Sequence, residues 1–434
     1  MEIKMSKYPS YKDSGVEWLG EIPEHWENIR MKHLFRDHSE KNKPNEELLS
    51  VTQNQGVVPR TWVENRMVMP SGALESFKFI NKGDFAISLR SFEGGLEFCH
   101  ANGIISPAYT VLKSKRKIAN QYYKYLFKSY SFISEIQTSV VGIREGKNIS
   151  YPELSYSFIP VPPLPEQTAI AQYLDEKTAL IDRAIDIKQK QIALLKERRQ
   201  VIIQQAVIRG LDPNVKMKDS GVEWIGEIPE GWEVKKLRYL ANCFPSNVDK
   251  HSKINEKEVR LCNYTDVYKN DYITDEMELM ISTASDDQIK KFTLKQGDIV
   301  ITKDSETASD IAVPTYVKED LTNVICGYHL AIIRTFQNLY SRYLFQALKT
   351  KLFNAQFEVC SNGITRVGLG NSDLKNGTFL VPSESEQIQI ADYIEKSSFK
   401  IATAISLKEK EIEKLKEYKA MLINSAVTGK IKIY

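Results

Sequence analysis

Two stretches of the chain, residues 28–160 and 234–381, carry loops rich in side chains that hydrogen-bond nucleic acids. In the first stretch these side chains are Gln53, Asn54, Gln55, Arg60, Arg90, Arg144 and Lys147. In the second stretch they are Asn263, Tyr264, Thr265, Tyr268, Lys269, Asn270, Lys303, Ser305, Thr307 and Arg366. Arginine pairs well with guanine and asparagine or glutamine with adenine, whereas lysine and serine commonly hold phosphates. Any one of them alone is more often a solvated loop residue, so the prediction of DNA readout depends on the whole set.

Patterns that would support catalysis are missing from the sequence. It contains no GxxxxGKS/T phosphate loop, no glycine-rich loop for a methyl donor, no HExxH pair and no Cys/His cluster with metal-ligand spacing. The five cysteines include no CxxC pair, which is typical of buried, reduced thiols. We therefore expect a non-catalytic chain that holds neither a metal nor a cofactor of its own.

The sequence contains an internal repeat. Residues 12–27 read KDSGVEWLGEIPEHWE and residues 218–233 read KDSGVEWIGEIPEGWE, so 14 of 16 positions are identical. The mixture of Gly, Pro and Trp excludes a regular helix or strand and indicates fixed turns. An element that is the same in both halves cannot distinguish two different ligands. We therefore interpret its tryptophans as packing residues and assign discrimination to the dissimilar inserts.

Each insert combines short β-like runs with a later helical segment. The runs include KGDFAISLR and AYTVLK in residues 28–160, and QGDIVITK and LAIIRT in residues 234–381. The Gly-Asp pairs at 83–84 and 297–298 occupy matching places. We therefore expect two α+β domains of one common fold, each of about 130 to 150 residues, which is a normal domain size.

The segments that follow the inserts have the spacing of coiled-coil helices. Apolar residues recur at alternating intervals of four and three up to Gly210, and the pattern returns 220 residues later up to Gly429. The first seam contains Leu174, Ile181, Ile185, Lys188, Ile192, Leu195 and Ile202. The second contains Ile394, Ile401, Ile405, Lys408, Ile412, Leu415 and Leu422. One such helix alone would expose its seam to water, so we expect the two helices to pack on each other.

The relative direction of the two helices follows from the repeat. Two copies of one unit most simply pair about a pseudo-twofold axis, which makes the helices antiparallel. Lys188 and Lys408 lie at equivalent seam positions, where a polar residue can specify register at a cost in stability. An equally open interpretation is that both side chains extend to the edge of the seam. The expected fold class is α+β, with two globular domains separated by two long antiparallel coiled-coil helices and an internal pseudo-twofold repeat.

The repeat divides the 434 residues into six segments. In order, they are a first repeat element (1–27), a first insert (28–160), a central helix and linker (161–215), a second repeat element (216–233), a second insert (234–381) and a C-terminal helix (382–434). No apolar run approaches the roughly 20 residues needed to cross a bilayer, and the N-terminus lacks the apolar core of a signal peptide. We therefore expect a cytoplasmic protein without membrane contact. The net charge of +3 supports DNA binding only weakly, so basic residues would have to be clustered or supplied by partner subunits.

Four features together resemble one family. They are the GVEWLGEIPEHW opening, the phrase IPVPPLPEQTAIAQYLDEKTALIDRAI, the heptad helix that follows, and the repetition of the whole plan. Over nearly the full chain they resemble the specificity subunit of type I restriction-modification enzymes. In its second copy the phrase reads FLVPSESEQIQIADYIEKSS, which keeps Glu386, Gln387, Ala391 and Tyr393 but lacks the double proline.

The resemblance implies a division of labour among several subunits. The two inserts would be target recognition domains, each reading one half of a split, asymmetric target in double-stranded DNA. The paired helices would dock two methyltransferase subunits, which would bind the methyl donor S-adenosylmethionine, and motor-nuclease (restriction) subunits can join such a complex. The chain itself would be the non-catalytic DNA-specificity subunit.

Two other classes of function stay open on the residues alone. A non-catalytic protein-interaction scaffold with no DNA contact would suit the near-neutral net charge and the coiled coil. A self-contained nuclease would show metal-dependent DNA cleavage by the purified chain. A gel-shift series across salt concentrations separates the scaffold from a DNA-binding protein, because phosphate binding weakens steeply as salt rises.

Overall fold

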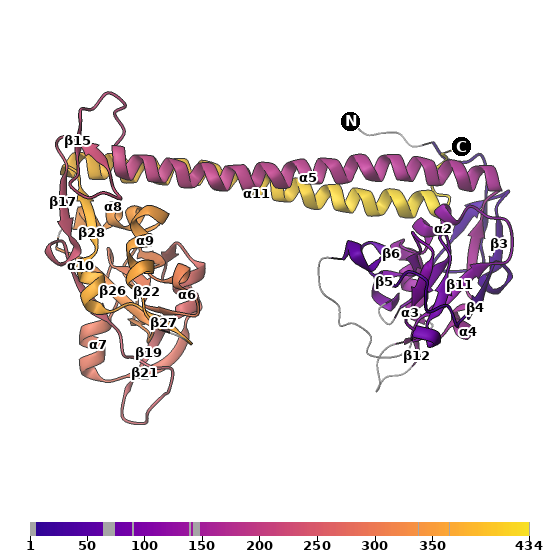
Figure 1. Ribbon diagram of the computed structural model, residues 1–434, viewed down its shortest axis with the longest axis horizontal. Helices are drawn as coiled ribbons and strands as arrows, with labels where there is room; N and C mark the ends of the chain where they lie inside the picture. The colour runs from indigo at the N-terminus through magenta and orange to yellow at the C-terminus, as the bar shows by residue number, and fades with distance from the viewer. Residues whose placement is uncertain are drawn as a thin grey trace. The chain divides into compact units, whose positions relative to one another are not determined.

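The computed structural model describes residues 6–63, 74–88, 91–138, 140–141, 148–336, 338–363 and 365–433. The chain forms two compact units, one made of residues 1–189 with 409–434 and the other of residues 190–408. Each unit contains one repeat element, one insert and a part of each long helix (Figure 1).

The first unit is a mixture of short strands and short helices beside the long ones. Its strands are β1 (Tyr11–Asp13), β2 (Glu21–Pro23), β3 (Glu27–Arg30), β4 (Phe35–His38), β5 (Leu49–Thr52), β6 (Gly56–Pro59), β7 (Lys78–Ile80), β8 (Phe85–Ile87), β9 (Glu97–Phe98), β10 (Gly103–Ile105), β11 (Thr110–Ser114), β12 (Val140–Val141), β13 (Asn148–Ile149) and β14 (Phe158–Val161). Its short helices are α1 (Ser91–Gly94), α2 (Asn120–Leu126), α3 (Tyr130–Thr138) and α4 (Tyr151–Leu154), with 3-10 turns η1 (Met31–His33), η2 (Arg60–Trp62) and η3 (Leu74–Ser76). The main sheet has the strand order β4-β11-β8-β9 and is antiparallel.

The second unit repeats this plan with larger sheets. Its strands are β15 (Met217–Asp219), β16 (Glu227–Pro229), β17 (Glu233–Lys236), β18 (Ala241–Pro245), β19 (Lys257–Cys262), β20 (Tyr272–Ile273), β21 (Met280–Ala284), β22 (Ile299–Thr302), β23 (Asp304–Ser305), β24 (Pro314–Val317), β25 (Val324–Cys326), β26 (Leu330–Thr335), β27 (Val367–Gly368) and β28 (Thr378–Val381). Its short helices are α6 (Tyr264–Lys269), α7 (Asp286–Phe292), α8 (Asn338–Leu348), α9 (Lys351–Cys360) and α10 (Asn371–Asn376), with 3-10 turns η4 (Leu237–Tyr239) and η5 (Ala308–Asp310). The main sheet has the order β18-β26-β22-β24-β20, and a second sheet has the order β21-β19-β25.

The two inserts share a common core. The antiparallel strands β4-β11-β8 of the first insert correspond to β18-β26-β22 of the second. In both inserts, the third strand of this core follows one of the matching Gly-Asp pairs of the sequence. Gly83 and Gly297 of these pairs have φ angles of 95° and 89°. The buried carboxylates of Asp84 and Asp298 accept backbone N–H bonds within these turns. The expected common fold is confirmed for this core.

Each repeat element contains a short antiparallel hairpin and ends in a buried tryptophan, so the prediction that this element has no regular strand is wrong. β1 pairs with β2, and β15 pairs with β16 in the same register. Trp26 and Trp232 are almost fully buried, and each packs edge to face against a tyrosine of its insert, Tyr122 or Tyr343. The interpretation of these tryptophans as packing residues is confirmed.

The two long helices are α5 (Leu164–Arg209) and α11 (Glu384–Val427). Gly210 and Gly429, just beyond their ends, have positive φ angles of 73° and 75°, as glycines that terminate helices commonly do. At the start of α11, the side chain of Glu386 accepts a hydrogen bond from the backbone N–H of Ser383, as the capping-box pattern predicts.

The helices are antiparallel, and within each unit they pair along the predicted seam. In the first unit Lys419 contacts Asp182 and Lys188 contacts Glu411, so residue numbers fall on α11 as they rise on α5. All fourteen predicted seam residues are buried or partly buried, whereas the residues between them are mostly exposed. The predicted seam and the predicted fold class are therefore confirmed.

The two seam lysines extend sideways to the other helix. The Nζ atom of Lys188 lies 2.5 Å from Glu411 Oε2 in the first unit. The Nζ atom of Lys408 donates to Gln191 Oε1 at 2.7 Å in the second unit. Both ammonium groups therefore leave the apolar seam for a polar side chain at its edge, as expected if the side chains snorkel.

The first insert packs against the C-terminal end of α11, and the second insert packs against the C-terminal end of α5. In the first unit the hydroxyl of Tyr122 donates to the carbonyl of Val427 at 2.7 Å. In the second unit the hydroxyl of Tyr343 donates to the carbonyl of Val207, also at 2.7 Å. The apolar core of the first unit accordingly includes Leu422, Ala426, Val427 and Ile431.

Four of the five cysteines are buried in the structure. Cys99, Cys243, Cys262 and Cys326 are buried, as expected, but Cys360 at the end of α9 is exposed, so that expectation is wrong for this residue. In the described part of the chain, no helix is both long enough and apolar enough to cross a bilayer.

Candidate nucleic-acid interface

The second insert contains a groove with a volume of about 720 Å³. Its lining includes six of the ten predicted DNA-binding residues of this insert. They are Asn263, Tyr264, Thr265, Tyr268, Ser305 and Arg366. They come from three separate places in the chain, namely helix α6 with its N-cap, strand β23 and the loop before β27. The fold therefore brings together side chains that are up to about a hundred residues apart.

Helix α6 supplies one wall of the groove. Asn263 caps the helix, and its backbone N–H donates to the carboxylate of Asp266 at 2.8 Å. Tyr264 and Tyr268 are one helical turn apart and stack with a centroid distance of 5.6 Å and an interplanar angle of 13°. The hydroxyl of Tyr264 lies 3.0 Å from Ser305 Oγ, which ties this wall to β23.

A row of hydrogen bonds links strand β23 to Arg366 in the lining of the groove. Lys303 Nζ and His329 Nδ1 both contact the carboxylate of Asp304, at 2.8 Å and 2.9 Å. Arg366 Nη1 lies 2.9 Å from His329 Nε2. Burial alone would raise the pKa of Asp304, but the hydrogen bonds from Lys303 and His329 hold that pKa below its ordinary value.

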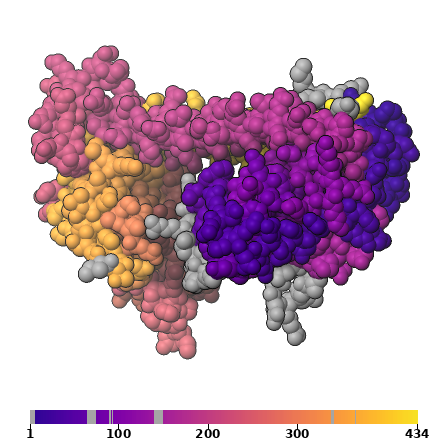
Figure 2. Space-filling model, turned by 45° about the vertical axis from the view of Figure 1, so that its right-hand side comes forward, coloured from indigo at the N-terminus to yellow at the C-terminus, as the bar shows by residue number. Residues whose placement is uncertain are grey.

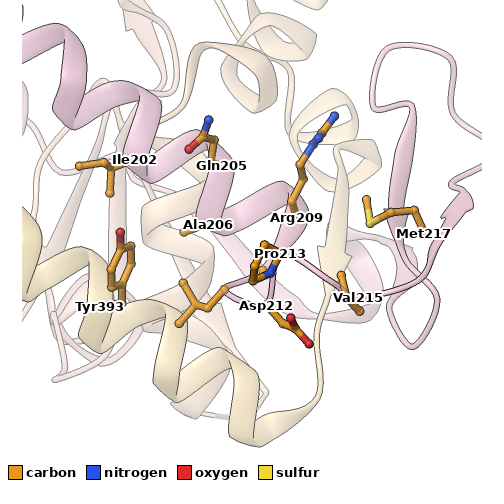
Figure 3. Close-up of a pocket in the computed structure, with 11 residues that line it drawn as sticks. Ile202, Gln205, Ala206, Arg209, Asp212, Pro213, Val215, Met217 and Tyr393 are labelled. Atoms are coloured by element: carbon orange, nitrogen blue, oxygen red, sulfur yellow. The ribbon is translucent and has the colours of Figure 1, made fainter.

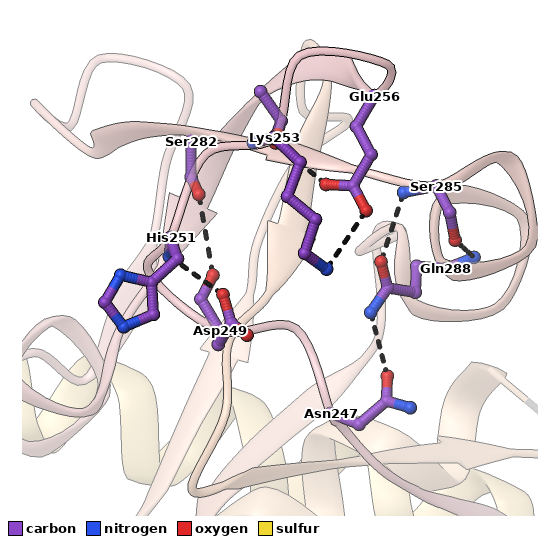
Figure 4. Close-up of polar contacts among 9 residues, drawn as sticks. Asn247, Asp249, His251, Lys253, Glu256, Ser282, Ser285 and Gln288 are labelled. Carbon is purple, nitrogen blue, oxygen red and sulfur yellow. Dashed lines mark hydrogen bonds and ion pairs between the residues drawn. The ribbon is translucent and has the colours of Figure 1, made fainter.

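Residues 249–251 line another side of the groove, and the segment 247–256 that contains them is fixed by polar contacts (Figure 4). Gln288 Nε2 donates to Asn247 Oδ1 at 3.2 Å, and the backbone N–H of Lys253 donates to Thr283 Oγ1 at 2.8 Å. Because both ends of the segment are held, its middle can present Asp249, Lys250 and His251 to the groove.

The other predicted residues of the second insert lie near the groove without lining it. Lys269 is exposed in the last turn of α6, and Asn270 donates its side-chain amide to the carbonyl of Asp266. The ammonium of Lys303 is held by Asp304, and the hydroxyl of Thr307 donates to Asp310 at 2.8 Å. DNA contact by any of these residues stays a prediction.

In the first insert the predicted residues form the tip of a hairpin. Gln53, Asn54 and Gln55 are exposed in the turn between β5 and β6, and Arg60 follows in η2 beside the exposed Trp62. The ammonium of Lys128 supports the tip, because it donates to the carbonyls of Gln53 and Gly94 and contacts the buried carboxylate of Glu97. Arg90, Arg144 and Lys147 lie outside the described residues, so the structure does not place them.

The charged residues that line the second-insert groove favour base edges over phosphates as ligands. Its acidic lining residues are Asp249, Asp304, Glu306 and Asp310, and its basic ones include Lys250, His251 and Arg366. Carboxylates repel phosphates, whereas base edges offer amino donors as well as acceptors. This mixture of charges therefore fits base edges better than the phosphate backbone.

Sequence reasoning missed Asp304 and His329 as groove residues. Both are common residue types in loops, and the groove assigns them a role only because β23 and the start of β26 are brought side by side. The positive φ angle of His329, 72°, could not be predicted from the sequence either.

A second hollow, of about 640 Å³, lies at the end of α5 (Figure 3). It is lined by Ile202 and Gln205 of α5, by the linker around Pro213, and by Tyr393 of α11. None of the predicted DNA-binding residues lines it. Among the residues that the structure describes, no group of three or more His, Cys, Asp or Glu side chains is arranged to hold a metal ion.

The architecture defines a class of internally repeated proteins, in which two α+β inserts of one fold are carried on an antiparallel helix pair. Residues 23–197 and 229–417 match the family described as Type I restriction modification DNA specificity domain. These ranges cover most of the chain, which therefore belongs to this family and contains two copies of its domain.

Two similar proteins are specificity subunits of type I restriction enzymes. The specificity subunit of the type I restriction enzyme MjaVIII from Methanocaldococcus jannaschii is 24% identical over 425 residues, which are 95% of this chain and 94% of the relative. The specificity subunit of EcoBI from Escherichia coli is 25% identical over 291 residues, 64% of this chain and 59% of the relative.

Two solved structures share the fold. The HsdS subunit of Thermoanaerobacter tengcongensis matches with a TM-score of 0.53 and 14% identity, covering 94% of this chain and 98% of that chain. A chain from a structure described as explaining complex assembly and conformational transition of the type I R-M system matches with a TM-score of 0.69 and 13% identity, again covering 94% and 98%.

Proposed function

We propose that this chain is the sequence-specific DNA-recognition subunit of a type I restriction-modification complex, and that each insert reads one half of a split, asymmetric target. The observation that carries the proposal is the groove of the second insert, where six residues predicted from the sequence converge on a surface suited to base edges. Membership of a DNA specificity family supports it. The chain itself is non-catalytic in this proposal, and S-adenosylmethionine binds to methyltransferase partners.

The inserts differ outside their common core, so the two half-sites should differ in sequence. Exchanging residues 28–160 for the insert of another family member should change one half of the methylated motif and leave the other half unaltered. Genome-wide mapping of adenine methylation, with and without the exchange, measures this. A palindromic motif, or a change in both halves, would contradict two independent readers. The same mapping in a strain lacking the gene should show no such motif.

The same proposal assigns the outer face of α5 to the methyltransferase subunits. Leu180 and Ile187 in the first unit, and Leu194 and Val201 in the second, recur every seven residues outside the seam and are 46–63% exposed. Side chains of α5 lie at the surface in the space-filling view (Figure 2). Apolar residues on an otherwise polar outer face are typical of a helix that packs against a further helix.

Replacing Leu194 with aspartate should weaken binding of the methyltransferase subunit by roughly tenfold or more, because a charge would enter an apolar contact. The melting temperature of the isolated chain should not change, since Leu194 is 63% exposed. Gln204→Asp places the same charge on an exposed, polar position of α5 and is the matched control. Sedimentation of mixtures of the two subunits measures the difference. Equal binding by both variants would exclude this face of α5 as the docking surface.

A further inference from the structure

His329 occupies an unusual place in the second-insert groove. Its backbone has a positive φ of 72°, a conformation that costs energy in a residue other than glycine and asparagine. Its two ring nitrogens face different partners, Asp304 at 2.9 Å and Arg366 at 2.9 Å. The strained backbone and the two opposed contacts together hold the ring in one orientation.

The partners determine which ring nitrogen donates and which accepts. A guanidinium has only donors, so Nε2 of His329 must accept the hydrogen bond from Arg366. The Nδ1 atom of the same ring then donates to Asp304. Asp304 is in turn held by Lys303 Nζ at 2.8 Å and is only 15% exposed. The row Lys303, Asp304, His329 and Arg366 thus ends in a guanidinium whose position is set by the three groups behind it.

The position of Arg366 suits one kind of ligand. Arg366 is exposed and lines the groove, and the bond to His329 uses one of the five N–H donors of its guanidinium. The carboxylates along the groove disfavour a phosphate, whereas guanine presents two acceptors, O6 and N7, to such a planar donor. We propose that Arg366 contacts a guanine base in the half-site read by the second insert, and that His329 is its positioning residue. The proposal rests on the DNA-recognition function proposed above.

The first test replaces the guanidinium in the full chain assembled with its methyltransferase subunits. The half-site of the second insert is the one that changes when residues 234–381 are exchanged. Arg366→Gln should weaken binding to the target duplex by roughly 5- to 150-fold and abolish the preference for guanine at one position of this half-site. The slope of log K against log salt should stay the same, because no phosphate contact is lost. Discrimination at the half-site of the first insert is the internal control for folding.

The second test separates positioning by the imidazole from the backbone conformation. His329→Gly accepts the positive φ but has no side chain, so Arg366 loses its anchor and the guanine preference should fall. His329→Asn also tolerates this backbone and supplies both a donor and an acceptor, so it should restore part of the preference. Thermal unfolding of both assembled complexes checks that the variants are folded.

Each contrary outcome would overturn a different part of the proposal. A salt slope reduced by about one in Arg366→Gln, with guanine still preferred, would show a phosphate contact and overturn the base contact. A wild-type preference in His329→Gly would overturn the positioning role. If the wild-type complex itself showed no sequence preference, the proposed DNA-recognition function would fail, and not only this inference.

Discussion

Replacing Leu422 with aspartate is expected to unfold the core of the first unit while the core of the second insert stays folded. Leu422 is 2% exposed and belongs to the same apolar cluster as Trp26, Tyr122 and Phe127, although it lies near the C-terminus. Burying an unpaired carboxylate there should cost about 4 kcal/mol or more, a large share of the roughly 5 to 15 kcal/mol that stabilises a domain. Hydrogen exchange, read segment by segment, measures the effect: amides of α2 should lose protection and those of β22 should keep it.

The neighbouring residue provides the matched control for this variant. Met421 is 57% exposed on the outer face of the same helix, so Met421→Asp adds the same charge without burial. Its effect on the stability of the isolated chain should stay within about 0.5 kcal/mol. Equal loss of protection in α2 and β22 after Leu422→Asp would contradict the assignment of the end of α11 to the first unit.

The long helices could be predicted because their signal is local. A seam with alternating spacings of four and three is visible within one helix, and the second copy repeats it 220 residues later. Burial in the structure follows these positions in both helices. The glycines that end the helices were readable for the same reason, since a helix end is determined by a few adjacent residues.

The packing of each insert against the other helix was not predictable from such patterns. The hydrogen bond from Tyr122 to Val427 joins residues that are 305 positions apart, and neither residue type marks the contact. The bond from Tyr343 to Val207 is its counterpart in the second unit. Such pairs follow from the antiparallel repeat as a whole, in which the end of one helix lies beside the start of the other.

The candidate site was predictable only in its composition. Asn263, Tyr264 and Arg366 belong to residue types that suit DNA, and the groove does bring them together. The sequence did not reveal that Lys303 would be held by Asp304, nor that His329 would stand between Asp304 and Arg366. These contacts depend on loops that meet only after the sheets have formed.

The support of the hairpin tip in the first insert rests on a buried ion pair. The carboxylate of Glu97 is fully buried, and Lys128 Nζ lies 2.7 Å from its Oε1 atom. Its Oε2 atom has no hydrogen-bond partner among the described residues. Burial raises the pKa of Glu97 to about 7, although the attraction of Lys128 opposes this rise. The same ammonium holds the carbonyl of Gln53, so the ion pair connects stability to a predicted DNA contact.

The pKa of Glu97 gives the stability of the first insert a pH dependence of known sign. Between about pH 4.5 and 7 the folded state keeps a proton that the unfolded state has released, so stability falls as the pH rises through this window. Each pKa unit corresponds to about 1.4 kcal/mol, which makes the total roughly 3 kcal/mol. Above this window the contribution of Glu97 is constant. Glu97→Gln should therefore remove most of this slope.

Replacing Lys128 with methionine should cost about 3 to 5 kcal/mol at pH 8, because it leaves the charge of Glu97 buried without a partner. At pH 5 Glu97 is protonated and the loss should be clearly smaller, since the attraction no longer acts on a charge. Lys124→Met is the matched control: its ammonium contacts Asp175, which is 49% exposed, so the loss should be about 1 kcal/mol or less at both pH values. Urea unfolding of the three proteins at pH 5 and pH 8 measures these differences. An equal loss at both pH values in Lys128→Met would mean that the lysine acts through the carbonyls of Gln53 and Gly94 and not through Glu97.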